Sequence, residues 1–159
     1  MERFVGIPYV PHGRGYDGAD CWGVLYLYYR DVLGILVPTY SAEMEARRFD
    51  RRDIGPLMRA ERDRDWVQVE TPAVGDCVLM RVGRDESHVG VFIGSGRMLH
   101  SEGPHPSQIE RMADVRWRDR ITGFYRTIHV DDPKRDAADH RPERDGGRLS
   151  ASLSSSRAA

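Results

Sequence analysis

Residues 17–24 read Asp-Gly-Ala-Asp-Cys-Trp-Gly-Val. A glycine-marked turn, an aspartate and then an apolar run predict a helix with Cys21 in its first turn. A helix N-terminus presents unpaired backbone N–H groups and a partial positive charge. Both favour the thiolate, so we expect the pKa of Cys21 to be lowered and the N–H groups to be available to an oxyanion.

This helix should run from about Asp20 to Leu33, with Gly34 as its C-terminal cap. Its spacing predicts one apolar face, made of Trp22, Leu25, Tyr29 and Val32. Residues 41–64 favour helix but are highly charged, and they predict two short surface helices. Their arginines are most simply a solvated helix face, with docking to an acidic partner as the alternative.

After residue 65 the pattern changes to alternating or short apolar runs, which are typical of strands. We expect strands over 66–70, 77–82, 88–93, 97–101, 107–111 and 121–128, with a polar loop over 83–87. Helices therefore precede an antiparallel meander, and the predicted fold class is α+β.

Composition limits the choice of function. The chain has 159 residues, 40% of them hydrophobic, and a net charge of −1, so it offers no case for a nucleic-acid partner. No apolar run approaches a membrane span, and the N-terminus lacks the apolar run of a signal peptide, which predicts synthesis and retention in a cytoplasm. From about Val130 the chain turns polar, so we expect a folded domain over 1–129 and a disordered tail over 130–159.

The chain has two cysteines, too few for a disulfide framework. Cys77 begins a predicted strand and is interpreted as a small core residue. No spacing typical of a metal site is present, so we expect no metal and no cofactor.

Two histidines complete a candidate catalytic set with Cys21. The turn Gly94-Ser-Gly96 folds the strand of His88 back on the strand of His100, and pairing about Ser95 places His100 opposite Val89 or Gly90. The two imidazoles would then meet, as a base and the group that orients it require. Together the three residues suggest a Cys-His-His hydrolase.

Simpler interpretations stay open for each residue. A cysteine in a helix is often a packing residue, and a histidine at the start of a strand can simply mark its edge. Tyr9 is either an exposed loop residue or a phenol that hydrogen-bonds near the thiolate. Gly23 is expected to give close backbone access beside the thiol.

In combination, these motifs resemble the NlpC family of papain-like cysteine peptidases. The matching stretches are Gly6-Ile-Pro-Tyr9, Asp20-Cys-Trp-Gly23, Pro72-Ala-Val-Gly-Asp76, His88-Val-Gly-Val-Phe-Ile-Gly94 and Met98-Leu-His-Ser101. They follow the family's order and cover roughly residues 4–128. The resemblance implies a papain-like NlpC fold, with Cys21 as nucleophile, His88 as base, His100 as the orienting residue and Tyr9 as a helper.

Two positions depart from the common pattern of the family. Trp22 stands where many members have serine, and His12-Gly13 replaces a Gly-Gly pair. The aromatic residue after the cysteine and the Leu99-His100 pair look more like a phage-tail or prophage branch of cell-wall peptidases. This branch implies phage tail proteins as partners and an enzyme that a virion carries to the wall.

The family resemblance implies hydrolysis of an amide in peptidoglycan stem peptides, of the D-γ-glutamyl–diaminopimelate type. Two alternatives remain. One is a structural tail-assembly protein with a vestigial site, and the other is an amidase or acyltransferase that uses the same residues on another substrate.

Overall fold

The computed structural model describes residues 1–40, 60 and 64–128. The predicted helices over 41–64 and the predicted tail over 130–159 lie essentially outside these residues. The elements in chain order are η1 (Glu2–Phe4), β1 (Arg14–Gly15), β2 (Gly18–Ala19), α1 (Cys21–Tyr28), η2 (Tyr29–Leu33), β3 (Trp66–Val69), β4 (Cys77–Val82), β5 (Asp85–Phe92), β6 (Arg97–His100), β7 (Gln108–Arg111) and β8 (Ile121–Thr127).

The predicted helix forms where the sequence places it. Asp20 is its N-terminal cap, and its carboxylate accepts a hydrogen bond from the Gly23 N–H at 2.7 Å. After Tyr28 the helix widens into the π-helical turn η2, and Gly34 ends it in the left-handed conformation. The wider turn rotates Val32 out of the predicted apolar face, so Val32 is 47% exposed and its expected burial is wrong.

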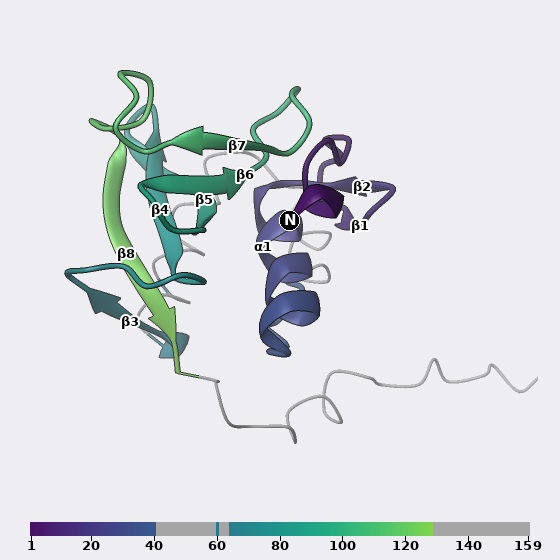
Figure 1. Ribbon diagram of the computed structural model, residues 1–159, viewed down its shortest axis with the longest axis horizontal. Helices are drawn as coiled ribbons and strands as arrows, with labels where there is room; N and C mark the ends of the chain where they lie inside the picture. Colours follow the sequence, from purple (N-terminus) through teal and green to yellow (C-terminus); the bar gives the residue numbers. More distant parts are fainter. Residues whose placement is uncertain (41–59, 61–63, 129–159) are drawn as a thin grey trace, which may run out of the picture.

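Six antiparallel strands form the main sheet in the order β3-β8-β4-β5-β6-β7. Strands β4 to β7 follow one another as a meander, and β8 returns to lie between β3 and β4 (Figure 1). The α+β class is therefore confirmed. The predicted loop over 83–87 is wrong, because Gly83, with a φ of 68°, makes a tight turn and β5 begins at Asp85.

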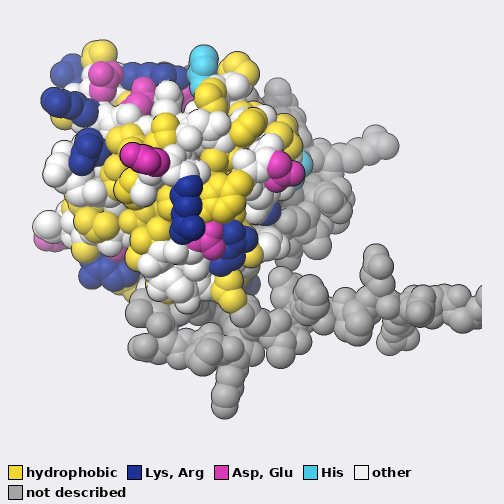
Figure 2. Space-filling model, turned by 45° about the vertical axis from the view of Figure 1, so that its right-hand side comes forward, with side chains coloured by type: hydrophobic (Ala, Val, Ile, Leu, Met, Phe, Trp, Pro, Cys, Tyr) yellow, Lys and Arg dark blue, Asp and Glu magenta, His cyan; other side chains and the backbone are white. Residues whose placement is uncertain are grey.

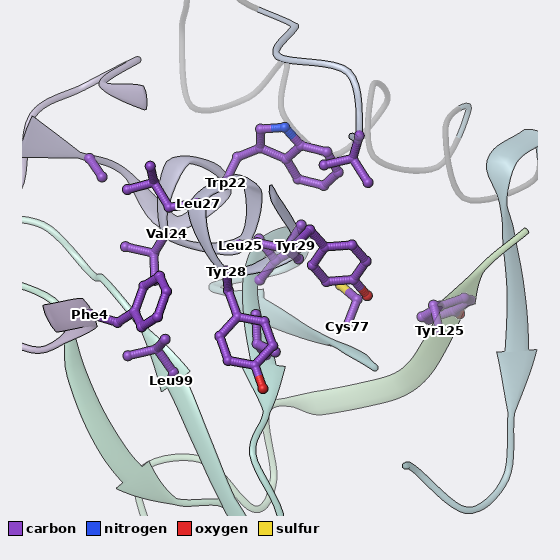
Figure 3. Close-up of a cluster of buried hydrophobic side chains, with 14 of the residues drawn as sticks. Phe4, Trp22, Val24, Leu25, Leu27, Tyr28, Tyr29, Cys77, Leu99 and Tyr125 are labelled. Carbon is purple, nitrogen blue, oxygen red and sulfur yellow. The ribbon is translucent and has the colours of Figure 1, made fainter. Parts of the chain in front are cut away.

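Helix α1 packs against one face of this sheet. Its buried side chains meet apolar residues of β4, β5, β6 and β8 in one core (Figure 3). Residues on both sides of this contact include Leu25, Tyr29, Cys77, Leu99 and Tyr125. Cys77 is 3% exposed, so its predicted place in the core is confirmed.

A second, smaller cluster covers the other face of the sheet. It is built from Val78, Met80, Met98 and Trp117. Trp117 belongs to the turns between β7 and β8 and is completely buried. The alternation of side chains along a strand assigns His88 and His100 to this second face, because His88 pairs with Met80 and His100 lies two residues from Met98.

The N-terminal segment contains η1 and the small β1–β2 hairpin. Ser107 ties this segment to the residues just before β7. Its hydroxyl donates to the Phe4 carbonyl at 2.7 Å and accepts from the Ile7 N–H at 2.8 Å. Figure 1 shows the N-terminus beside α1.

Candidate active site

The predicted hairpin register is confirmed. His100 pairs with Gly90 across β5 and β6, so His88 lies diagonally opposite His100 on the same face. Gly90 carries no side chain between them, and a Cβ there would lie 3.2 Å from the His100 Cβ. The rings meet with the His88 Nε2 atom 3.1 Å from the His100 Nδ1 atom.

Both imidazoles are almost completely buried, at 4% exposure for His88 and 0% for His100. Trp117 covers the pair: its ring stacks on His88 with centroids 5.6 Å apart and meets His100 edge-on at 4.7 Å. Burial lowers the pKa of His88 to about 3, with smaller contributions from His100, Arg116 and Arg120. His88 is therefore a neutral imidazole at neutral pH.

Glu110, which the sequence reasoning missed, continues the chain of contacts. It lies on β7, and its Oε2 atom is 2.7 Å from the His100 Nε2 atom. The same oxygen accepts a hydrogen bond from the Trp117 Nε1–H at 2.6 Å. Burial lowers the pKa of His100, and Glu110 opposes that shift. The predicted strand over 107–111 held the only signal for Glu110, since its alternation places Glu110 on the face of His100.

Cys21 begins α1 and is partly buried. It packs against the core that contains Val89 of β5, and backbone contacts from Val89 and Trp22 lower the pKa of its thiol. Val89 is the residue next to His88. The hydrogen bonds of the described residues do not include one between the Cys21 thiol and the His88 ring. The structure thus joins the two histidines directly on one face of the sheet, whereas Cys21 belongs to α1 and packs with the core on the other face.

The expected lowering of the Cys21 pKa is wrong. Burial raises the pKa of the thiol to about 12, and the carboxylate of Asp20 adds to the rise. The backbone contact from Val89 and the charge of Arg14 lower the pKa, but burial outweighs them. The resting site therefore holds a thiol and a neutral imidazole.

The loop before α1 is held by Asp20. Besides capping Gly23, its carboxylate accepts from the His12 N–H at 3.0 Å and from the Arg14 guanidinium at 2.7 Å. A Cβ on Gly23 would lie 2.1 Å from the Gly13 carbonyl oxygen. The missing side chain of Gly23 thus admits the backbone of the loop, and its expected role in access to the thiol stays a prediction.

Tyr9 is partly buried, and its ring packs on Gly103, where a Cβ would lie 2.6 Å from the ring. Gly103 follows β6, so Tyr9 lies beside the segment that leaves His100. Its expected hydrogen bond near the thiol stays a prediction.

Across the part of the chain that the structure describes, no group of three or more His, Cys, Asp or Glu side chains is arranged to hold a metal ion. Within the same residues, no helix has both the length and the apolar character needed to cross a membrane. In Figure 2, positive and negative side chains lie near one another among hydrophobic ones. This face shows no continuous surface of one charge.

The sequence matches the model of the NlpC/P60 family over residues 6–126. The chain belongs to this family. The matched range contains Cys21, His88, His100 and Glu110. The predicted family resemblance is therefore confirmed.

Two curated relatives illustrate the match. The chain is 30% identical over 132 residues to the murein DD-endopeptidase MepH of Escherichia coli K12, which covers 80% of this chain and 44% of that protein. It is 24% identical over 136 residues to a γ-DL-glutamyl hydrolase of Bacillus subtilis 168, which covers 84% of this chain and 29% of that protein. The chain thus spans less than half the length of these relatives.

Solved structures support the fold. An NlpC/P60 family protein from Bacillus cereus ATCC 10987 superposes with a TM-score of 0.56 at 24% identity, covering 77% of this chain and 36% of the other. A family member from Staphylococcus aureus gives a TM-score of 0.56 at 21% identity, covering 80% and 38%. The papain-like α+β fold expected from the sequence is therefore confirmed.

Proposed function

We propose that this chain is a cysteine peptidase that hydrolyses an amide bond in peptidoglycan stem peptides. The observation that carries the proposal is the His88–His100 pair next to the strand position that contacts the Cys21 sulfur. The relative named as a murein DD-endopeptidase supports a wall-peptide substrate. The name of the γ-DL-glutamyl hydrolase agrees with the D-γ-glutamyl–diaminopimelate bond that the family resemblance implies, whereas the DD-endopeptidase is named for a different bond.

The proposed reaction requires the Cys21 sulfur and the His88 ring to come within reach of one another. As the sulfur attacks the amide carbon, its proton passes to the His88 Nδ1 atom. His100 holds the opposite side of the ring at Nε2. The imidazolium then protonates the leaving amine, which leaves a thioester on Cys21. Water, losing a proton to His88, cleaves the thioester and restores the free thiol.

The order of these steps follows from the neutral resting state of the Cys21 thiol and the His88 imidazole. Because burial raises the pKa of Cys21 and lowers the pKa of His88, the proton moves only as the new carbon–sulfur bond forms. Backbone N–H groups at the start of α1 and the Tyr9 phenol are the proposed donors to the oxyanion. The phage-tail setting and the tail partners remain predictions from Trp22 and Leu99-His100.

Digestion of purified, amidase-treated peptidoglycan tests this function. Wild type, Cys21→Ala and the control Cys77→Ala are compared in a reductant, with products identified by mass spectrometry. New stem-peptide fragments with wild type and Cys77→Ala, absent with Cys21→Ala, would support the proposal and name the bond. Products joined to a second amine would indicate an acyltransferase, and the absence of products from all three would favour a structural tail protein.

A further inference from the structure

The carboxylate of Glu110 has a bonding pattern that fixes where protons lie in the histidine pair. Its Oε2 atom receives the Trp117 Nε1–H, which can only donate, and lies 2.7 Å from the His100 Nε2 atom. An ionised carboxylate can only accept. The His100 Nε2 atom therefore carries the hydrogen.

The protonation of the other three ring nitrogens of His100 and His88 follows from this assignment. A neutral imidazole has one N–H, so the His100 Nδ1 atom is an acceptor. The His88 Nε2 atom, 3.1 Å away, must then donate to it. This leaves the His88 Nδ1 atom with a free lone pair, the form that can take a proton from a thiol.

We propose that Glu110 is a positioning residue that locks both His100 and His88 in the Nε2–H tautomer, so that His88 presents a basic Nδ1 atom. This inference rests on the proposed function for its catalytic consequence. The tautomers themselves depend only on the chain of contacts from Glu110 through His100 to His88.

The placement of Glu110 fits this role. Its side chain is 25% exposed while the His100 side chain is 0% exposed, so the carboxylate lies at the boundary between the buried pair and solvent. Arg116 lies 3.6 Å from its second oxygen, Oε1. The charge is thus partnered on the outer side while Oε2 serves the two buried donors.

Glu102 supplies a matched control. It pairs with the same Arg116 and lies 3.7 Å from Arg120, and it acts on His100 through its charge and not through a hydrogen bond. Glu102→Gln therefore removes a carboxylate from the same surface group and leaves the hydrogen-bonded contacts of both imidazoles in place. Glu110→Gln keeps an acceptor oxygen without the charge, and Glu110→Ala removes the acceptor.

The first measurement is a two-bond ¹H–¹⁵N spectrum of the imidazoles at neutral pH in the full chain. We expect both His88 and His100 as Nε2–H tautomers in wild type, Glu102→Gln and Glu110→Gln. In Glu110→Ala we expect His100 to shift toward the Nδ1–H form. An Nδ1–H tautomer of His100 in wild type would overturn the inference even if Glu110→Ala did not fold.

Peptide release provides the second readout. We expect kcat for Glu110→Ala to fall by about tenfold or more, with partial recovery in Glu110→Gln and no change in Glu102→Gln. An unchanged kcat and unchanged tautomers in a folded Glu110→Ala variant would contradict the role. If wild type showed the expected tautomers but released no peptide, the proposed function would fail while the assignment of Glu110 stood.

Discussion

The His88 Nε2 atom lies 3.1 Å from the His100 Nδ1 atom, although twelve residues separate the two in the chain. The contact depends on one register, in which His100 faces Gly90. Because Gly90 has no side chain, the His100 ring can reach across to His88. The geometry of the pair is thus set by a hairpin turn and a glycine.

Gly90→Ala tests this dependence. The added Cβ would lie 3.1 Å from the Leu99 carbonyl oxygen and 3.2 Å from the His100 Cβ, so the hairpin must shift by a few tenths of an ångström. We expect a loss of about 1–2 kcal/mol in the free energy of unfolding and a lower kcat. Ser95→Gly, at the turn of the same hairpin, is the control and should leave kcat unchanged. Full activity in Gly90→Ala would show that the pair tolerates another spacing.

Acid should destabilise the fold through the two histidines. Their pKa values are lowered in the folded state, to about 3 for His88, whereas an unfolded histidine titrates near 6.5. Below about pH 6.5 the unfolded chain binds more protons, so stability is complete above that pH and is lost as the pH falls toward 3. The expected slope is up to about 1.4 kcal/mol per pH unit for each histidine.

Urea unfolding at several values between pH 4 and pH 8 measures this slope. His88→Gln removes one group whose pKa is lowered by burial and should flatten the curve. A free energy of unfolding that stayed constant from pH 7 to pH 4 in wild type would contradict the buried, neutral state of the pair.

Alkylation of Cys21 tests the resting state of the thiol. Because burial raises its pKa to about 12, the rate with iodoacetamide should increase about tenfold per pH unit well beyond pH 9. Cys77→Ala leaves a single thiol for measurement by mass spectrometry, and free cysteine provides the reference. A rate that is high and constant between pH 5 and pH 8 would instead indicate a thiolate paired with a protonated His88.

Much of this site could be predicted from local sequence. Asp20 before Cys21 placed a helix start, and Gly94-Ser-Gly96 set the hairpin that aligns His100 with Gly90. These features depend on neighbours in the chain. The positions of β8 and Trp117 could not be predicted in this way, because they depend on a return of the chain across the sheet.

The prediction of a lowered pKa for Cys21 was wrong for a related reason. A helix N-terminus is visible in the sequence, but the burial of the sulfur against β5 arises from tertiary packing. Glu110 was missed because its role appears only when β7 lies beside β6 and Trp117 folds over both histidines. Burial and non-local contacts therefore decide the electrostatics of the site.

Asp20 offers a final test, because its structural and electrostatic effects can be separated. Its carboxylate caps Gly23 and binds both the His12 N–H and Arg14, and its charge raises the pKa of Cys21. Asparagine caps a helix about as well as aspartate, whereas alanine does not. Asp20→Ala should therefore lower the free energy of unfolding by about 1–2 kcal/mol, and Asp20→Asn by clearly less.

Both variants remove the negative charge beside the thiol and leave the nearby Arg14 cation. The pKa of Cys21 should fall in each, so the alkylation profile should move to lower pH by a similar amount in both. Thermal or urea unfolding measures the change in the free energy of unfolding. Alkylation in the Cys77→Ala background measures the change in the pKa of Cys21. If the profile moved in Asp20→Ala alone, the shift would follow from the loosened helix start, and the charge of Asp20 would have no direct effect on the thiol.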